Sequence, residues 1–108
     1  MIIWLLLLQA VVADGASPGR EKYEPFRKCL LKQAATLAQA KDDDRVVLEA
    51  ARSNCMRVNL ASGSAAMFAE IKAGATKEQA IDRVAALRLA AEQEALTQIR
   101  SIRSNGEK

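Results

Sequence analysis

The spacing of apolar positions predicts a chain of helices. After Pro25, apolar residues recur every three or four positions, which places them on one face of an α-helix. Proline suits the first turn of a helix, so the first helix is expected to begin near Glu24 or Pro25. Its apolar face would hold Phe26, Cys29, Leu30, Ala34, Leu37 and Ala38.

A second helix is expected to begin at the acidic run Asp42–Asp44. Aspartates accept hydrogen bonds from free N–H groups at a helix start and are favoured there by the helix dipole. Three consecutive acids followed by Arg45 lack the alternating ligands and the glycine of a calcium loop, so no metal is expected. The apolar positions of this helix would include Val47, Ala51, Cys55 and Val58.

Gly63 stands between two serines, which predicts a break in the helix at residues 61–64. A short helix over residues 65–72 would follow, with Met67, Phe68 and Ile71 turned inward. Gly74 is placed to end it.

The last predicted helix covers residues 77–103, about 40 Å at 1.5 Å per residue. Thr76 and Gln79 form a capping-box pattern at its start. No alternating strand pattern occurs in the sequence. The chain is therefore expected to be all-α, a small bundle of about four helices over residues 24–104, with a disordered tail over residues 105–108.

The N-terminal segment resembles a secretory signal. An apolar run over residues 2–8 is followed by Val11 and Ala13, at the −3 and −1 positions where small residues precede a cleavage site. Residues 1–13 are therefore interpreted as a signal peptide, although the segment is short and carries no Lys or Arg before the apolar run. The run is well below the roughly 20 residues of a spanning helix, so no stable membrane insertion is expected after cleavage. Residues 14–23 would form a flexible polar lead. The alternative is a buried N-terminal helix in a cytoplasmic protein.

The two cysteines are placed to meet. Cys29 and Cys55 each lie thirteen positions from residue 42 (42 − 29 and 55 − 42), where the turn between the first two helices is expected. Positions equidistant from the turn of an antiparallel helix hairpin lie at the same height. In an exported protein the pair would oxidise to a structural disulfide. Two buried free thiols and intermolecular bonds are the alternatives.

The composition argues against catalysis. The chain contains no histidine, and its sequence has no glycine-rich phosphate loop and no zinc-ligand spacing. The remaining carboxylate candidates are interpreted as parts of solvated helix faces: Glu49, Glu70, Glu92 and Glu94. We therefore expect no enzymatic activity, no metal and no cofactor.

Two classes of function remain. Residues 69–87 have the outline of a DNA-binding helix-turn-helix, in which Lys77, Gln79 and Arg83 would face DNA. The net charge of +3 is weak for nucleic-acid binding, and the signal peptide disfavours a cytoplasmic role. The leading hypothesis is a small exported protein, periplasmic or secreted, that binds another protein, as inhibitors, immunity proteins and secretion-system accessories do.

The last helix carries the predicted partner site. It is longer than the first helix, so its C-terminal half could overhang the bundle and leave apolar side chains uncovered. A partner, or a second copy in a homodimer, would bind there unless the second and short helices cover it. The predicted site consists of Leu96, Ile99 and Ile102, flanked by Arg100 and Arg103.

Overall fold

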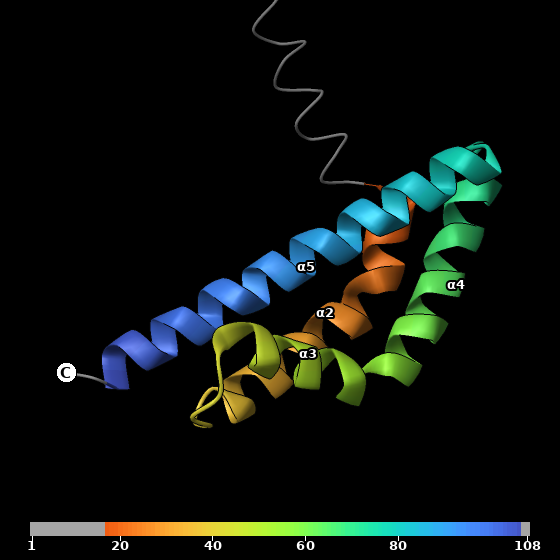
Figure 1. Cartoon of the computed structure of the whole chain (residues 1–108). Coiled ribbons are helices and arrows are strands. Elements are labelled where there is room, and N and C mark those ends of the chain that lie inside the picture. The colour runs from red at the N-terminus through yellow and green to blue at the C-terminus, as the bar shows by residue number, and fades with distance from the viewer. Residues whose placement is uncertain (1–16, 107–108) are drawn as a thin grey trace, which may run out of the picture.

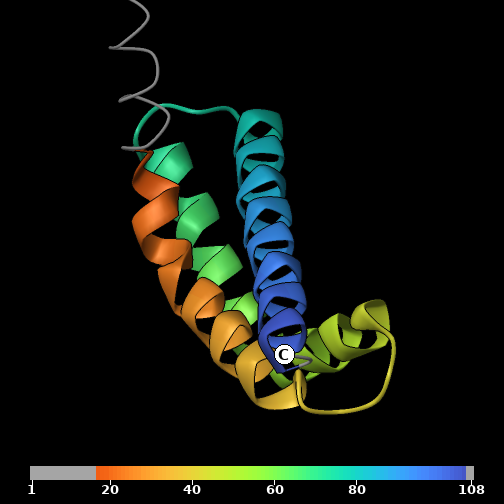
Figure 2. The same ribbon diagram turned by 90° about the vertical axis from the view of Figure 1, so that its left-hand side faces the viewer.

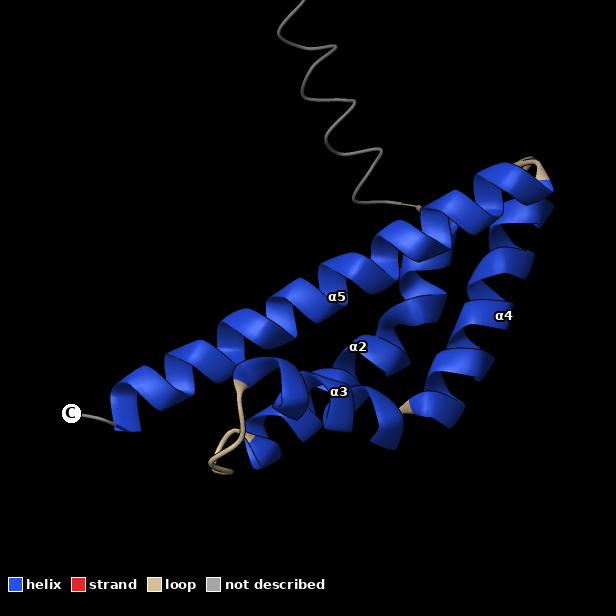
Figure 3. Cartoon of the chain, in the orientation of Figure 1, coloured by secondary structure: helices blue, strands red, loops and turns tan. Residues whose placement is uncertain are grey.

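The computed structural model describes residues 17–106, and within this range the chain forms four α-helices and no strand. They are α2 (Pro18–Leu37), α3 (Asp44–Asn54), α4 (Met56–Lys72) and α5 (Lys77–Gly106) (Figures 1 and 3). The predicted small all-α bundle is confirmed. The predicted signal peptide, residues 1–13, lies outside the described residues.

The helices form a flat assembly. From the turn at Gly74, α4 and α5 diverge like the arms of a V, α2 packs against both, and α3 closes the wide end (Figures 1 and 2). The Cα atoms extend 48 × 37 × 17 Å along the principal axes. In so thin a molecule, each helix keeps a large part of its surface away from the others.

The core lies where α2, α3 and α5 meet. Aromatic and leucine side chains of α2 are buried there together with alanines from each helix, and these small residues let the helices pack closely. Its largest fully buried apolar residues are Phe26, Leu30 and Ile99. The other buried apolar members are Tyr23, Ala34, Ala38, Val47, Leu48, Ala51, Cys55, Ala66, Ala91 and Ala95.

The first helix begins earlier than predicted. Residues 18–23, expected in a flexible lead, are the first turns of α2, with Pro18 in the first turn and Tyr23 buried. Contacts with α4 stabilise these first turns and outweigh the weak helical pattern of residues 18–23 in the sequence. Pro25 lies inside the helix and is exposed; it has no N–H to donate to the carbonyl oxygen four residues earlier. At the other end α5 reaches Gly106, so residues 105 and 106 of the predicted tail are helical.

The break between the second and third helices also differs from the prediction. It occurs at Cys55, whereas Gly63 lies within α4. A glycine inside a helix costs about 1 kcal/mol relative to alanine, and the packing of this part of α4 on α2 offsets that cost. The capping box is confirmed: the Thr76 N–H donates to Gln79 Oε1 at 2.9 Å, and the Gln79 N–H donates to Thr76 Oγ1 at 3.1 Å.

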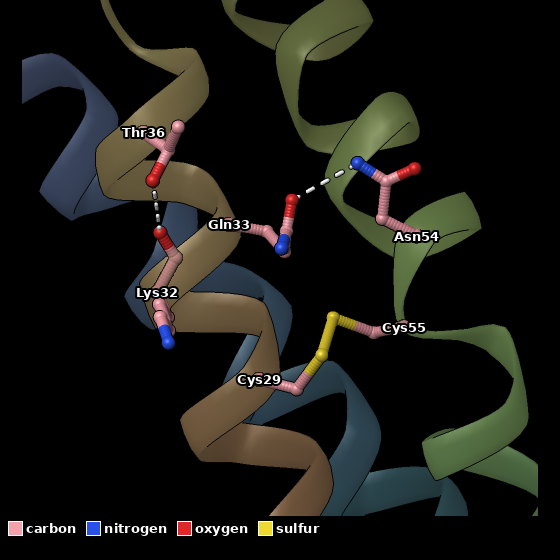
Figure 4. Close-up of a disulfide and its surroundings, with 6 residues drawn as sticks. All are labelled: Cys29, Lys32, Gln33, Thr36, Asn54 and Cys55. Atoms are coloured by element: carbon pink, nitrogen blue, oxygen red, sulfur yellow. Dashed lines mark hydrogen bonds between the residues drawn. A yellow bond between two sulfur atoms is a disulfide. The ribbon is translucent and has the colours of Figure 1, made fainter.

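The disulfide between Cys29 and Cys55 is present, with the two Cα atoms 6.0 Å apart (Figure 4). It joins the middle of α2 to the junction of α3 and α4. On the next turn of α2, the side-chain amide of Asn54 donates to Gln33 Oε1 at 2.9 Å. The predicted bond is confirmed. Disulfides are typical of oxidising, extracytoplasmic environments.

Candidate interaction surface on helix α4

The C-terminal half of α5, the predicted partner site, belongs to the core of the monomer. Ile99 is completely buried, and Leu96 and Ile102 are half-buried against the core. The prediction that these side chains form an exposed docking surface is therefore wrong. The overhang expected from helix length is covered by α3, one of the two helices that the alternative named, and by the connection between α2 and α3.

The two flanking arginines, Arg100 and Arg103, hold α3 and the connection between α2 and α3 against α5. Arg103 donates hydrogen bonds to the carbonyl oxygens of Ala38 at 3.2 Å and Ala40 at 2.7 Å, just after the end of α2. It also donates to Asp44 Oδ1 at 2.7 Å, and Arg100 lies 3.4 Å from Asp44 Oδ2. Arg100 and Arg103 thus serve intramolecular contacts, and the acidic run supplies their partner at the start of α3.

Large apolar side chains are instead exposed on α4. Four of them share one side of this helix, with exposed fractions between 46% and 69%. Met67, which is half-buried, lies along the same stripe. We call this stripe the α4 outer face; its exposed members are Met56, Leu60, Phe68 and Ile71. The sequence-based expectation that Phe68 and Ile71 turn inward is wrong.

The opposite side of α4 is small and polar. Ser62, Ala66 and Glu70 are buried there and pack towards α2. Beside them, the Tyr23 hydroxyl donates a hydrogen bond to Asn59 Oδ1. A helix that buries small residues and exposes large apolar ones forgoes burial worth about 1.5–3 kcal/mol for each large side chain. Such an inverted pattern is unfavourable for the monomer alone, and exposed apolar patches commonly mark interaction sites.

Glu70 fixes this rotation of α4. Its carboxylate is fully buried and accepts hydrogen bonds from the Ser17 hydroxyl at 2.8 Å, the Gly19 N–H at 2.6 Å and Arg83 at 2.8 Å. Burial favours the neutral acid, but the bonds from Arg83, Ser17 and Gly19 outweigh it, so the pKa of Glu70 lies below its ordinary value. The carboxylate ties the start of α2 to α4 and α5.

The exposed charges of α4 are all basic. Arg57 and Lys72 lie near the two ends of the α4 outer face, and both are exposed. Glu70 is the only acidic residue in α4, and it is buried. Within residues 17–106, neither Arg57 nor Lys72 takes part in an ion pair.

The carboxylates considered for acid–base chemistry are each paired with an arginine. Glu70 lies 2.8 Å from Arg83, and Glu94 lies 2.6 Å from Arg27. Arg52 bridges the other two, at 3.3 Å from Glu92 and 4.0 Å from Glu49. The hydrogen bond from Arg27 holds the pKa of Glu94 below its ordinary value, as the bonds to Glu70 do for that carboxyl.

A groove between α3 and α5 is a weaker candidate surface. Leu48 and Leu96 line it, and Leu89 is exposed at its edge. Its remaining lining includes the ion-paired Arg52 and Glu92, whose charges are already balanced within the chain. Arg57 and Lys72 beside the α4 outer face, in contrast, have no ion-pair partner among residues 17–106.

The helix-turn-helix interpretation gains no support from α4 and α5. Gln79 is occupied in the helix cap, and Arg83 is bonded to Glu70, so two of the three residues proposed to face DNA have intramolecular roles. Lys77 is exposed.

Across residues 17–106, no group of three potential metal-ligating side chains comes together, and no helix is long and apolar enough to cross a membrane.

The α4 outer face was missed by sequence reasoning, although the disulfide contained the signal. Once Cys55 is bonded to α2, positions on its side of the following helix must also face α2. These positions are Asn59, Ser62, Ala66 and Glu70. The residues on the other side of the helix, which form the α4 outer face, then have to point outward.

The chain matches no protein-family model, no curated protein and no solved structure.

Proposed function

We propose that this chain is a small exported, non-enzymatic protein that binds another protein through the α4 outer face. The observation that carries the proposal is the inverted α4, whose large apolar side chains are exposed while its small and polar side is buried. The core of the monomer is complete without Met56, Leu60, Phe68 and Ile71. Their apolar character therefore serves something outside the described fold.

Export is supported by two independent features. The disulfide between Cys29 and Cys55 is of the kind that persists in oxidising compartments. The apolar run at residues 2–8, with Val11 and Ala13 after it, is typical of a signal peptide cleaved before Asp14. Together they favour a periplasmic or secreted protein.

Trp4 provides a direct test of processing, because it is the only tryptophan of the chain and lies in the predicted signal peptide. Protein purified from the exported fraction should begin at Asp14 by N-terminal sequencing and show no tryptophan fluorescence. Intact Met1 and full tryptophan fluorescence in cytosolic protein would contradict export.

The binding function is tested by charged substitutions on α4, with a charged substitution on α5 as the control. Leu60→Asp with Phe68→Asp places two charges on the α4 outer face, whereas Leu89→Asp places one charge at an exposed leucine of α5. Both variants should keep the wild-type circular dichroism and melting temperature. After cross-linking in the native host, a partner captured by the wild type should be retained by Leu89→Asp and lost by the double variant. Retention of every captured protein by the double variant would refute binding through α4.

A further inference from the structure

We infer that the α4 outer face docks an amphipathic helix of a partner protein whose apolar stripe is bordered by acidic side chains. The inference rests on the proposed binding function and specifies its partner. It combines the spacing of apolar residues on α4 with the sign of the charges around them.

The spacing fits a helix lying alongside α4. Met56, Leu60, Met67 and Ile71 follow one another at intervals of four, seven and four residues, close to the repeat at which two packed helices keep contact. With 17 residues, α4 is about 25 Å long at 1.5 Å per residue, which corresponds to a partner helix of four to five turns. Ser64, which is exposed between Leu60 and Met67, allows a partner backbone to approach closely at mid-helix. Methionines adapt to varied partner side chains.

The charges select an acidic partner. Arg57 and Lys72 border the stripe near its two ends, and α4 exposes no carboxylate. At 100° per residue both cations lie on the Phe68 side of the stripe, so glutamates or aspartates along the rim of a partner helix on that side would meet them. Charge complementarity of this kind raises association rates and rejects partners of the same sign.

The same charges oppose a second copy of this chain. An antiparallel pair centred on Ser64 would match Leu60 with the partner copy's Phe68, since both lie four residues from the centre. Arg57 of one copy would then lie within one residue of the level of Lys72 of the other, at both ends of the interface, since they are seven and eight residues from the centre. A parallel pair would place each cation beside its own counterpart. Like charges in either arrangement disfavour self-association.

An anionic membrane surface would also attract basic residues. Polybasic membrane-binding segments carry about four to eight clustered Lys or Arg residues. The α4 outer face offers two, Arg57 and Lys72. Two cations are therefore enough to pair with acidic residues on a partner helix, but they are fewer than a membrane-binding segment carries.

The first experiment uses two synthetic helical peptides with the same leucine and isoleucine stripe. One has glutamates on both rims and the other has lysines. Fluorescence anisotropy with the purified, disulfide-bonded protein should show at least tenfold tighter binding of the glutamate peptide, and the difference should shrink as salt is added. Equal affinity for the two peptides, or binding of neither, would overturn the inference.

Charge-reversed proteins provide the matched control. Arg57→Glu with Lys72→Glu should reverse the peptide preference, whereas Lys28→Glu with Lys32→Glu, an equal charge change on exposed residues of α2, should leave it unchanged. Reversal in both double variants would trace the preference to net charge alone and overturn the inference.

Alternative occupants have distinct outcomes. Concentration-dependent dimers in sedimentation that Leu60→Asp abolishes would assign the face to a second copy. Binding to phosphatidylserine vesicles that the same variant abolishes would assign it to a membrane. Either result overturns the acidic helix. If the cross-linked host partner is lost with Leu60→Asp and Phe68→Asp but kept with Arg57→Glu and Lys72→Glu, binding through α4 stands and the acidic partner falls.

Discussion

Cys55, which is disulfide-bonded to Cys29 of α2, is the residue at which α3 ends and α4 begins. The bond fixes the position of α4 against α2 and the side of its first turn that faces α2. Because Cys55 points into the core, the buried side of α4 continues through Ser62 and Ala66, and the large apolar residues are carried outward. The covalent link thus determines which side of α4 faces away from α2.

Removing the disulfide should destabilise the fold without changing its topology. The bond closes a loop with a sequence separation of 26, which corresponds to about 3.5 kcal/mol in the chain-entropy treatment. Thermal unfolding of Cys29→Ser with Cys55→Ser, followed by circular dichroism, should give a melting temperature lower by roughly 15–25 °C. Dithiothreitol should lower the melting temperature of the wild type similarly and leave the variant unaffected. A wild-type protein insensitive to the reductant would contradict a stabilising bond.

Truncating Ile99 and Leu60 should have unequal effects. Ile99 is fully buried, so Ile99→Ala should lower the free energy of unfolding by about 2–5 kcal/mol. Leu60 is 66% exposed, so Leu60→Ala should change it by no more than about 0.5 kcal/mol. Urea denaturation measures both. A large loss at Leu60 would place the α4 outer face in the monomer's own core.

The sequence predicts those features that depend on local spacing and on covalent chemistry. The helical class, the capping box of Thr76 and Gln79, and the bond between Cys29 and Cys55 all follow from residue types at fixed separations. Such signals need no knowledge of the other helices.

The features that were missed depend on tertiary contacts. The first turns of α2 gain their stability from Glu70, which is distant in sequence and accepts the Gly19 N–H. The buried side of α4 is set by the fit of Ser62 and Ala66 against α2, although hydrophobicity alone favours burying Phe68 and Ile71. From its length alone, α5 was expected to extend beyond the other helices around Ile99. The packing of α3 against α5 covers this part, and neither helix by itself indicates that packing.

Two glycines should respond oppositely to replacement by alanine. A Cβ at Gly63 would meet only Tyr23 Cε1 at 3.9 Å, an ordinary contact, so Gly63→Ala should stabilise the protein by about 0.5–1 kcal/mol. Gly74 has open space around it but a φ of 110°, so Gly74→Ala should destabilise by about 1–2 kcal/mol through backbone strain. Urea denaturation of both variants checks the contrast, and a destabilised Gly63→Ala would show that α4 packs more tightly on α2 at this position.

Acid should weaken the fold through Glu70. Its carboxyl is buried, yet hydrogen bonds from Arg83, Ser17 and Gly19 hold its pKa below the ordinary value of 4.5. A carboxyl whose pKa is lower in the folded than in the unfolded chain contributes stability that is fully present above its unfolded pKa. That stability is lost as the pH falls through its folded pKa. The free energy of unfolding of the wild type should therefore decline below about pH 4.5.

Glu70→Gln should lower stability at neutral pH by about 1–3 kcal/mol, because an amide cannot satisfy the same three donors. The substitution should also make the free energy of unfolding decline less steeply as the pH falls. Glu94 is the matched control: Arg27 lowers its pKa too, but both side chains are partly exposed, so Glu94→Gln should lower stability by less than about 1 kcal/mol. Urea denaturation from pH 3 to pH 7 measures all three proteins. If Glu70→Gln keeps the full wild-type dependence on pH, the acid sensitivity arises elsewhere, and Glu70 is not the carboxylate that holds α2, α4 and α5 together.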